Sequence, residues 1–214
     1  MVFDMMQTLR SQLGFILAYF ISVTIAGAIK AWLAKKSGDY TADHAGYLTL
    51  DPLVHVDPFG LMSLLLVGFG WGAEVPVSIA NIIPPYRDLK ILAVYYVQTI
   101  VHIIFTALAI LLLAAIQLSQ LINLHQTVSI STLIIILSAF MTTNIFLAML
   151  RFIQSSIDLI CTHLVERDPA SIIYIHIGSL LVAMALLLFF GQQIQMFFAN
   201  ISSMLAMFVL RLFA

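Results

Sequence analysis

The chain has 214 residues, of which 62% are hydrophobic and 9% charged, and its formal net charge is -1. Soluble proteins carry about a quarter charged residues because their surface must be hydrated, so this composition excludes a soluble globular domain and predicts a surface that faces lipid. The near-neutral charge excludes nucleic acid as a partner, because phosphate recognition requires a basic face. A single cysteine, Cys161, excludes an internal disulfide and a cluster of thiolate metal ligands.

The expected fold is an all-α polytopic membrane protein formed by one domain. A bilayer core about 30 Å thick is crossed by about 20 apolar residues in a helix. Runs of this length predict about five transmembrane helices, at residues 12–34, 91–117, 128–152, 172–190 and 194–213. The last run is either a span or an interfacial helix.

The region 46–77, between the first two spans, has a different pattern. Its apolar stretch from Phe59 to Phe69 is too short to cross a bilayer, and glycines and Pro76 follow it, so we expect a re-entrant hairpin. Residues 46–50 alternate between apolar and other side chains, which predicts a short hairpin or edge strand. Lipid cannot satisfy irregular backbone, so the spans are expected to pack around this region.

The distribution of cations supports the re-entrant topology. If residues 37–90 leave and return on one side, the cytoplasmic side carries most of the basic residues, namely Lys35, Lys36, Arg87, Lys90, Arg151, Arg167 and Arg211. Positive charge accumulates on the cytoplasmic side of membrane proteins. We therefore expect the N-terminus outside and the C-terminus inside.

Two segments carry a family resemblance. Residues 37–60, with Gly38-Asp39-Tyr40-Thr41-Ala42 and then Gly46 to Gly60, resemble the G-D-x-T-A and G-R-L-T-L-N-P-L-x-H-I-D-P-x-G patterns of compact site-2 proteases. The likeness continues in the family's G-W-x-x-P-V-P-V-N-x-x-N and R-D patterns, matched here by Gly70-Trp71, Val75-Pro76-Val77, Asn81 and Arg87-Asp88. The resemblance implies an intramembrane metalloprotease frame and, by default, a bacterial inner membrane.

In that family the first helix carries H-E-x-x-H. Two histidines one helical turn apart bind zinc, and the glutamate polarises a zinc-bound water. Aligned on Ala31-Trp32, which look like the residues after the second histidine, the motif falls on Ala26, Gly27 and Lys30, and none of these can perform that chemistry.

The family's other two catalytic motifs are also absent. A-G-P-x-x-N would fall near residues 95–100, where it is not found. N-x-x-P-x-P-x-L-D-G, counted from Asn144, would fall on residues 151–160, where Asp158 stands one place early. The sequence therefore predicts a pseudoprotease with no metal and no cofactor.

Several polar residues allow two interpretations. His44, His55 and Asp57 could form a replacement metal site, but His55, Asp57 and Pro58 are better explained as residues that shape a turn. His102 and His176 would each satisfy a hydrogen bond between helices, or act in a proton relay.

Lys30 also allows two interpretations. Its ammonium either reaches the interface by snorkelling or pairs with Asp158 across the former zinc position.

The expected function is that of a binding, scaffold or assembly subunit in the bilayer. Its partner would be a transmembrane or extended segment of another membrane protein, held by strand addition. The candidate binding residues are Gly46, Leu48, Thr49, Leu50, Val75, Pro76 and Val77. The alternatives are an active metalloprotease with non-standard ligands, and a transporter or channel element. The lack of Asp, Glu or Arg in the middle of the expected spans disfavours transport.

Overall fold

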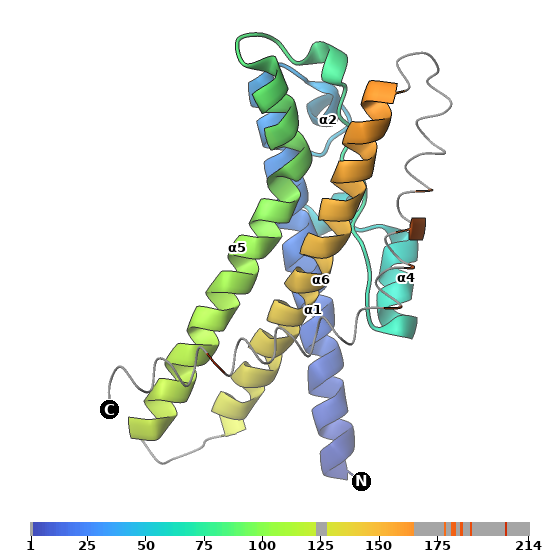
Figure 1. The fold of residues 1–214 in the computed structure, drawn as a ribbon. Coiled ribbons are helices and arrows are strands. Elements are labelled where there is room, and N and C mark those ends of the chain that lie inside the picture. The colour runs from blue at the N-terminus through green and yellow to red at the C-terminus, as the bar shows by residue number, and fades with distance from the viewer. Residues whose placement is uncertain are drawn as a thin grey trace.

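The computed structural model describes residues 2–122 and 128–164, together with a few isolated positions beyond them. Every regular element in these two ranges is helical. Three long helices form the body (Figure 1), and the short elements join the first long helix to the second. The long helices are α1 (Val2–Ser37), α5 (Arg87–Ile122) and α6 (Val128–Leu164). The short ones are α2 (Thr41–His44), α3 (Pro52–His55), α4 (Pro58–Val67) and the 3-10 helix η1 (Ile79–Asn81).

Each long helix contains a stretch that is long and apolar enough to cross a membrane. These stretches are Leu9–Ser37, Arg87–Ile116 and Thr132–Ile160. They coincide with the first three expected spans and suggest a membrane protein. The two expected spans at 172–190 and 194–213 lie outside the described residues, apart from isolated positions.

Helix α6 is longer than expected. We expected the span to end near residue 152, but the helix continues to Leu164. Arg151 does not end it, because the guanidinium is buried and bonded to protein groups instead of reaching water. Arg151 and Asp158 therefore lie inside an apolar helix and are both buried, which corrects the expectation of spans without internal charge.

A chain of buried polar groups connects the three long helices. The amide of Asn144 on α6 donates to Ser22 Oγ on α1 at 2.8 Å, and its oxygen bonds His102 Nδ1 on α5 at 2.9 Å. All three residues are almost fully buried. This confirms the interhelical hydrogen bond predicted for His102, and such bonds favour one helix register in lipid, where no water competes. His176 lies outside the described residues.

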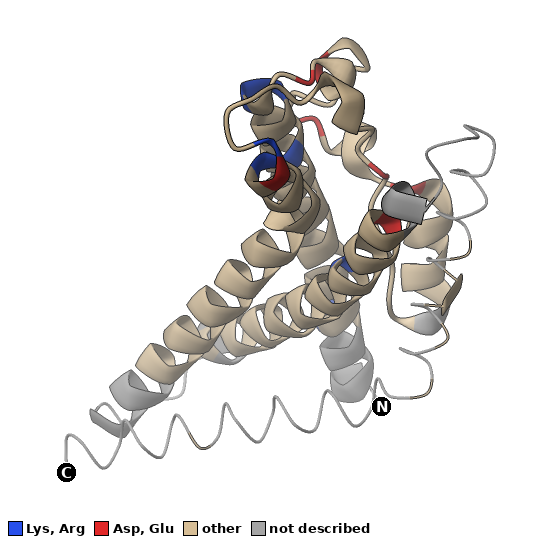
Figure 2. Ribbon diagram, turned by 45° about the horizontal axis from the view of Figure 1, so that its top comes forward, with Lys and Arg blue, Asp and Glu red and all other residues tan. Residues whose placement is uncertain are grey.

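Residues 38–86 begin and end at the same end of the bundle. The amide of Ile83 donates to the carbonyl of Ser37 at 3.1 Å, which joins the C-terminus of α1 to the segment just before α5. Most of the lysine and arginine positions coloured in Figure 2 gather at this end. The segment therefore returns to the end of the bundle from which it starts.

The return is made by a hairpin that consists of α4 and an extended segment, residues 69–78. Gly68 ends α4 with a φ of +90°, a left-handed conformation that glycine adopts without strain, and the chain reverses there. Gly60 and Gly70 allow the two arms to touch, since a Cβ on Gly60 would overlap the carbonyl of Trp71.

The expected strand at residues 46–50 does not form. These residues make turns and bends, and the β-pairing within the described region is one isolated antiparallel bridge between Val56 and Gly72. Alternation of side chains along five residues was therefore a misleading signal, because Gly46 adopts a φ of +81° in a turn that closes α2.

Candidate functional site

The G-D-x-T-A segment forms a latch between α1 and the hairpin. Asp39 is fully buried, and its carboxylate accepts from the amide and hydroxyl of Thr41, from Asn81 Nδ2 at 3.0 Å and from the amide of Ser78 at 2.7 Å. Burial disfavours the charged carboxylate and by itself raises its pKa. The hydrogen bonds together have the larger effect and hold the pKa of Asp39 below its usual value. The latch joins the chain just after α1 to the end of the extended arm of the hairpin.

The two Asp-Pro pairs begin helices. Asp51 accepts from the amide of Leu53 at 3.0 Å and starts α3, and Asp57 accepts from the amide of Gly60 at 2.7 Å and starts α4. Proline follows each cap at the first helical position, where its missing amide hydrogen has no cost. Asp57 and Pro58 are therefore turn residues, as the sequence predicts.

His55 is part of the same turn. Its Nε2 lies 2.9 Å from the carbonyl of Thr49, and because a carbonyl can only accept, Nε2 carries the proton. His44, the other histidine of the possible replacement metal site, stacks on Tyr40. The structure therefore separates these residues into local contacts, which supports the turn interpretation.

The space beside Gly27, where the family motif has its glutamate, is filled by the side chain of His55. The ring of His55 lies against Gly27 so closely that a Cβ there would overlap Nδ1. His55 is 1% exposed, and its other ring nitrogen is bonded to Thr49. A side chain at position 27 would therefore have to displace a buried, hydrogen-bonded ring.

Position 30, where the motif has its second histidine, belongs to a buried ion-pair triad of Lys30, Glu74 and Arg151. Lys30 Nζ lies 2.5 Å from Glu74 Oε1, and an Arg151 guanidinium nitrogen contacts Glu74 Oε2. The side chains of Lys30 and Arg151 are 6% and 5% exposed, so the expectation that Lys30 snorkels to the interface is wrong. Glu74, in the extended arm of the hairpin, joins α1 to α6.

Arg151 has further partners. Its second guanidinium nitrogen donates to the carbonyls of Gly72 at 2.8 Å and Ala73 at 3.3 Å, and Gln154 on the next turn of α6 accepts at 3.2 Å. A buried cation requires such neutralisation and hydrogen bonding to be tolerated. The triad is thus a cation-rich cluster, which would repel a metal ion.

The remaining positions of the expected catalytic region supply little chemistry. Ala26 is fully buried, and Asp158 lies buried on α6, two turns beyond Arg151. Across the residues that the structure describes, no group of three or more His, Cys, Asp or Glu side chains is arranged to hold a metal ion.

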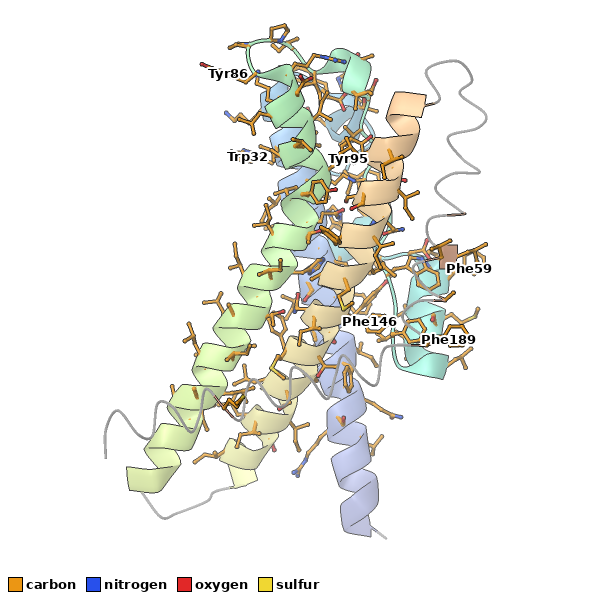
Figure 3. The ribbon with its side chains drawn as sticks, viewed as in Figure 1. Trp32, Phe59, Tyr86, Tyr95, Phe146 and Phe189 are labelled. Atoms are coloured by element: carbon orange, nitrogen blue, oxygen red, sulfur yellow. The ribbon has the colours of Figure 1, made fainter. Side chains whose placement is uncertain are left out.

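The expected binding residues divide into two sets. Leu48, Thr49 and Leu50 line a groove of about 310 Å³ against one face of α1, whose wall is formed by Ile25, Ala28, Ile29 and Trp32. The groove is almost entirely apolar, and Trp32, half exposed, lies toward the end of the bundle that carries Tyr86 (Figure 3). The amides of residues 48–50 donate to no other group within the described ranges. Apolar walls therefore lie beside open main-chain donors.

The second set lies elsewhere. Val75 is 1% exposed and packs in a small core with Ala31 and Ala42, while Pro76 and Val77 are half-buried and do not line the groove. Gly46 is exposed in the turn before it. The structure thus brings residues 48–50 to a groove and assigns residue 75 to the core.

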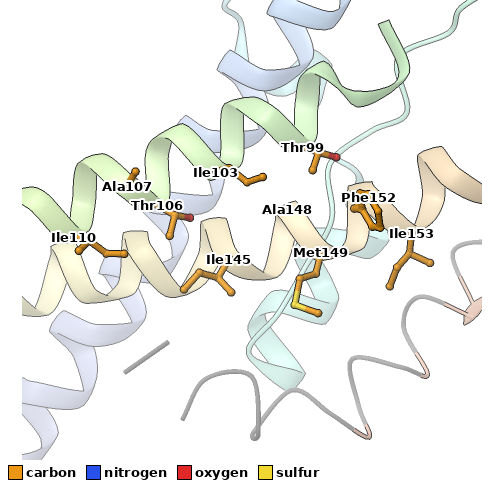
Figure 4. Close-up of a pocket in the computed structure, with 10 residues that line it drawn as sticks. All are labelled: Thr99, Ile103, Thr106, Ala107, Ile110, Ile145, Ala148, Met149, Phe152 and Ile153. Carbon is orange, nitrogen blue, oxygen red and sulfur yellow. The ribbon is translucent and has the colours of Figure 1, made fainter. Parts of the chain in front are cut away.

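A larger hollow, of about 520 Å³, opens between α5 and α6 (Figure 4). Aliphatic side chains such as Ile103 and Ile145 line it from both helices, and none of its lining residues is titratable. It lies within the membrane-spanning stretches, so it offers apolar surface to lipid chains.

Sequence reasoning missed Glu74. The residue stands where the family pattern G-W-x-x-P-V-P-V has its first proline, and it is the acidic residue of an otherwise uncharged stretch, 58–86. A carboxylate in such a stretch requires a cation, and Lys30 and Arg151 were the buried candidates. That signal was present in the composition, but the sequence gives no distance between the three segments.

These features describe an all-helical protein with three helices long and apolar enough to span a membrane and a glycine-containing hairpin beside them, which suggests a membrane protein. Over 63 residues the chain is 41% identical to "Putative zinc metalloprotease YwhC" of Bacillus subtilis (strain 168). The match covers 29% of this chain and 29% of that protein, and it supports a relationship to site-2 proteases. No protein-family model matches the chain, and no solved structure matches it.

Proposed function

We propose that this chain is a catalytically inactive relative of site-2 proteases that binds a segment of another membrane protein. The observation that carries the proposal is the occupation of two of the three functional positions of the first motif, 27 and 30. The ring of His55 fills the space at position 27, and Lys30 is held by Glu74 and Arg151. Hydrolysis by this family's chemistry requires a metal-activated water and a carboxylate base at those positions.

The groove beside α1 is the proposed binding site. Apolar walls would hold alternate side chains of a bound segment, and the open amides of residues 48–50 would donate hydrogen bonds to its carbonyls. An amide without a partner costs several kcal/mol in hydrocarbon, so an extended peptide is a favourable occupant near membrane depth. Such binding requires neither metal nor base, and it fits a scaffold or assembly subunit.

Photocrosslinking tests the proposal directly. A photoreactive residue at Leu50, which lines the groove and is 69% exposed, should form an adduct with a partner protein in native membranes. Leu111 is the matched control, because it is 66% exposed on α5 and lies outside the groove. Adducts from Leu111 and none from Leu50 would place the partner on the helix surface and refute groove binding.

A further inference from the structure

We infer that Glu74 is a positioning residue, which sets the shape of the groove from the opposite side of α1. The inference deepens the proposed function and rests on it, since it concerns the same groove. Glu74 does not line the groove. It acts through a continuous series of contacts that ends at Thr49.

The series begins with the two oxygens of one carboxylate. Oε1 bonds Lys30 on α1, and Oε2 bonds Arg151 on α6. Because the two cations belong to different helices, Glu74 fixes the extended arm of the hairpin between them. Arg151 reinforces this by donating to the carbonyls of Gly72 and Ala73 on the same arm.

The next contact joins the extended arm of the hairpin to the C-terminal end of α3. The amide of Ala73 donates to the carbonyl of His55 at 2.8 Å, and Val56 forms the antiparallel bridge with Gly72. Gly72 has no room to shift toward α1, because a Cβ there would lie 2.8 Å from Cβ of Val23. The extended arm therefore fixes the backbone at residue 55.

The last contact joins His55 to Thr49, one of the residues that line the groove. Its Nε2 donates to the carbonyl of Thr49 at 2.9 Å, while the opposite edge of the ring lies against Gly27 on α1. The ring therefore lies between α1 and residues 48–50 and sets the distance between them. Its position follows from the hairpin, and the position of the hairpin follows from Glu74.

Disulfide formation across the groove measures this shape without any partner. Leu48→Cys and Ile29→Cys place one thiol on each wall, in a background with Cys161→Ser, which removes the native cysteine. We expect Glu74→Gln to slow disulfide formation about fivefold or more, the lower end of typical coupling between linked sites. Glu74→Asp keeps the charge and should restore part of the rate.

Two controls separate positioning from general destabilisation. Asp43→Asn breaks the half-exposed Lys35–Asp43 pair, 2.8 Å long, and should leave the rate unchanged. A second thiol pair, Ala109→Cys with Ile145→Cys, reports on the apolar packing of α5 with α6, away from the groove.

An unchanged rate at the groove in Glu74→Gln would overturn the inference, and so would an equal slowing at both thiol pairs. Slowing confined to the groove would support it. Partner capture at Leu50 is measured separately, so a chain that passes this test and captures no partner would refute the proposed function alone.

Discussion

The imidazole of His55 lies directly against the α-carbon of Gly27, so the C-terminal end of α3 packs on α1 only because position 27 has no side chain. His55 is 1% exposed and bonded through its other nitrogen to Thr49. The ring of His55 and any side chain at position 27 would therefore compete for one space.

The first prediction follows from this contact. Gly27→Ala should lower the free energy of unfolding by about 1–3 kcal/mol, the usual cost of forcing an extra methyl into a filled site. Thermal or denaturant unfolding in detergent measures it. In a His55→Ala background the same substitution should cost much less, because the space is then vacant. An equal cost in both backgrounds would show that the two residues do not compete.

The second prediction concerns metal content. Protein purified without chelators should hold no stoichiometric zinc, because two positions of the first motif are occupied by His55 and by the cation of Lys30. Elemental analysis of the purified protein provides the measurement. About one zinc per chain would refute the proposal of a pseudoprotease.

The third prediction concerns the triad. Glu74→Gln leaves two buried cations without their shared carboxylate, a loss of about 3–5 kcal/mol for a fully buried pair. Glu74 retains 37% exposure, so we expect about 2 kcal/mol. Asp43→Asn, in the half-exposed pair with Lys35, should cost less than about 1 kcal/mol. Equal losses in the two variants would show that burial of the triad contributes nothing to stability.

A variant without the three charges provides a second test of how the triad affects stability. Combining Lys30→Met, Glu74→Gln and Arg151→Met removes the buried charges together, so stability should recover relative to Glu74→Gln alone. A triple variant less stable than the single one would indicate that Lys30 and Arg151 stabilise the fold mainly by packing and by their bonds to Gly72 and Ala73.

The long helices could be predicted because hydrophobic length is a local property. Twenty apolar residues in a row predict a span whatever surrounds them, and residues 12–34 and 91–117 lie in helices as expected. The end of α6 could not be predicted in this way. Arg151 looks like a residue at the interface, and only its contacts with Glu74 and Gly72 explain why the helix continues.

The candidate site was less predictable, because it depends on distances between segments. Turns at the two Asp-Pro pairs could be predicted, because such pairs commonly open turns. The structure shows in addition that the side chains of Asp51 and Asp57 cap short helices by accepting from backbone amides. The partner of Lys30 could not be predicted, because Glu74 is 44 residues away in an irregular segment. Contact between His55 and Gly27 could not be inferred from their spacing either.

The fourth prediction concerns pH and the Asp39 latch. Because the pKa of Asp39 is lower in the folded chain, its carboxylate stabilises the fold at pH values above the unfolded pKa of about 3.9. That contribution is lost as pH falls through the folded pKa. Asp39→Asn should therefore cost about 2 kcal/mol at neutral pH, and the difference from the unmodified chain should shrink on acidification below about pH 4.

Unfolding measured from pH 7 to pH 3 tests this sign. Asp88→Asn is the control, because Asp88 is exposed at the same end of the bundle. A destabilisation by Asp39→Asn that stays constant down to pH 3 would mean that the latch depends on shape and not on charge.

The last prediction concerns topology. The amide of Ile83 donates to Ser37 at 3.1 Å, so the end of α1 and the start of α5 lie together. If residues 38–86 crossed the membrane completely, about 30 Å of hydrocarbon would separate these two points. We therefore expect residues 38–86 to return to their own side of the membrane, and the cations at this end predict that this side is cytoplasmic.

Cysteines at Lys36 and Arg87, both exposed, report on that side, and a cysteine at Arg10 reports on the opposite end of α1. In the Cys161→Ser background, an impermeant maleimide added to intact bacterial cells should label position 10 and spare positions 36 and 87. Permeabilised cells should become labelled at all three. Labelling of 36 and 87 from opposite sides would refute the hairpin topology, whereas labelling of both from outside would keep the hairpin and reverse the orientation, because the hydrogen bond between Ile83 and Ser37 fixes only their common side.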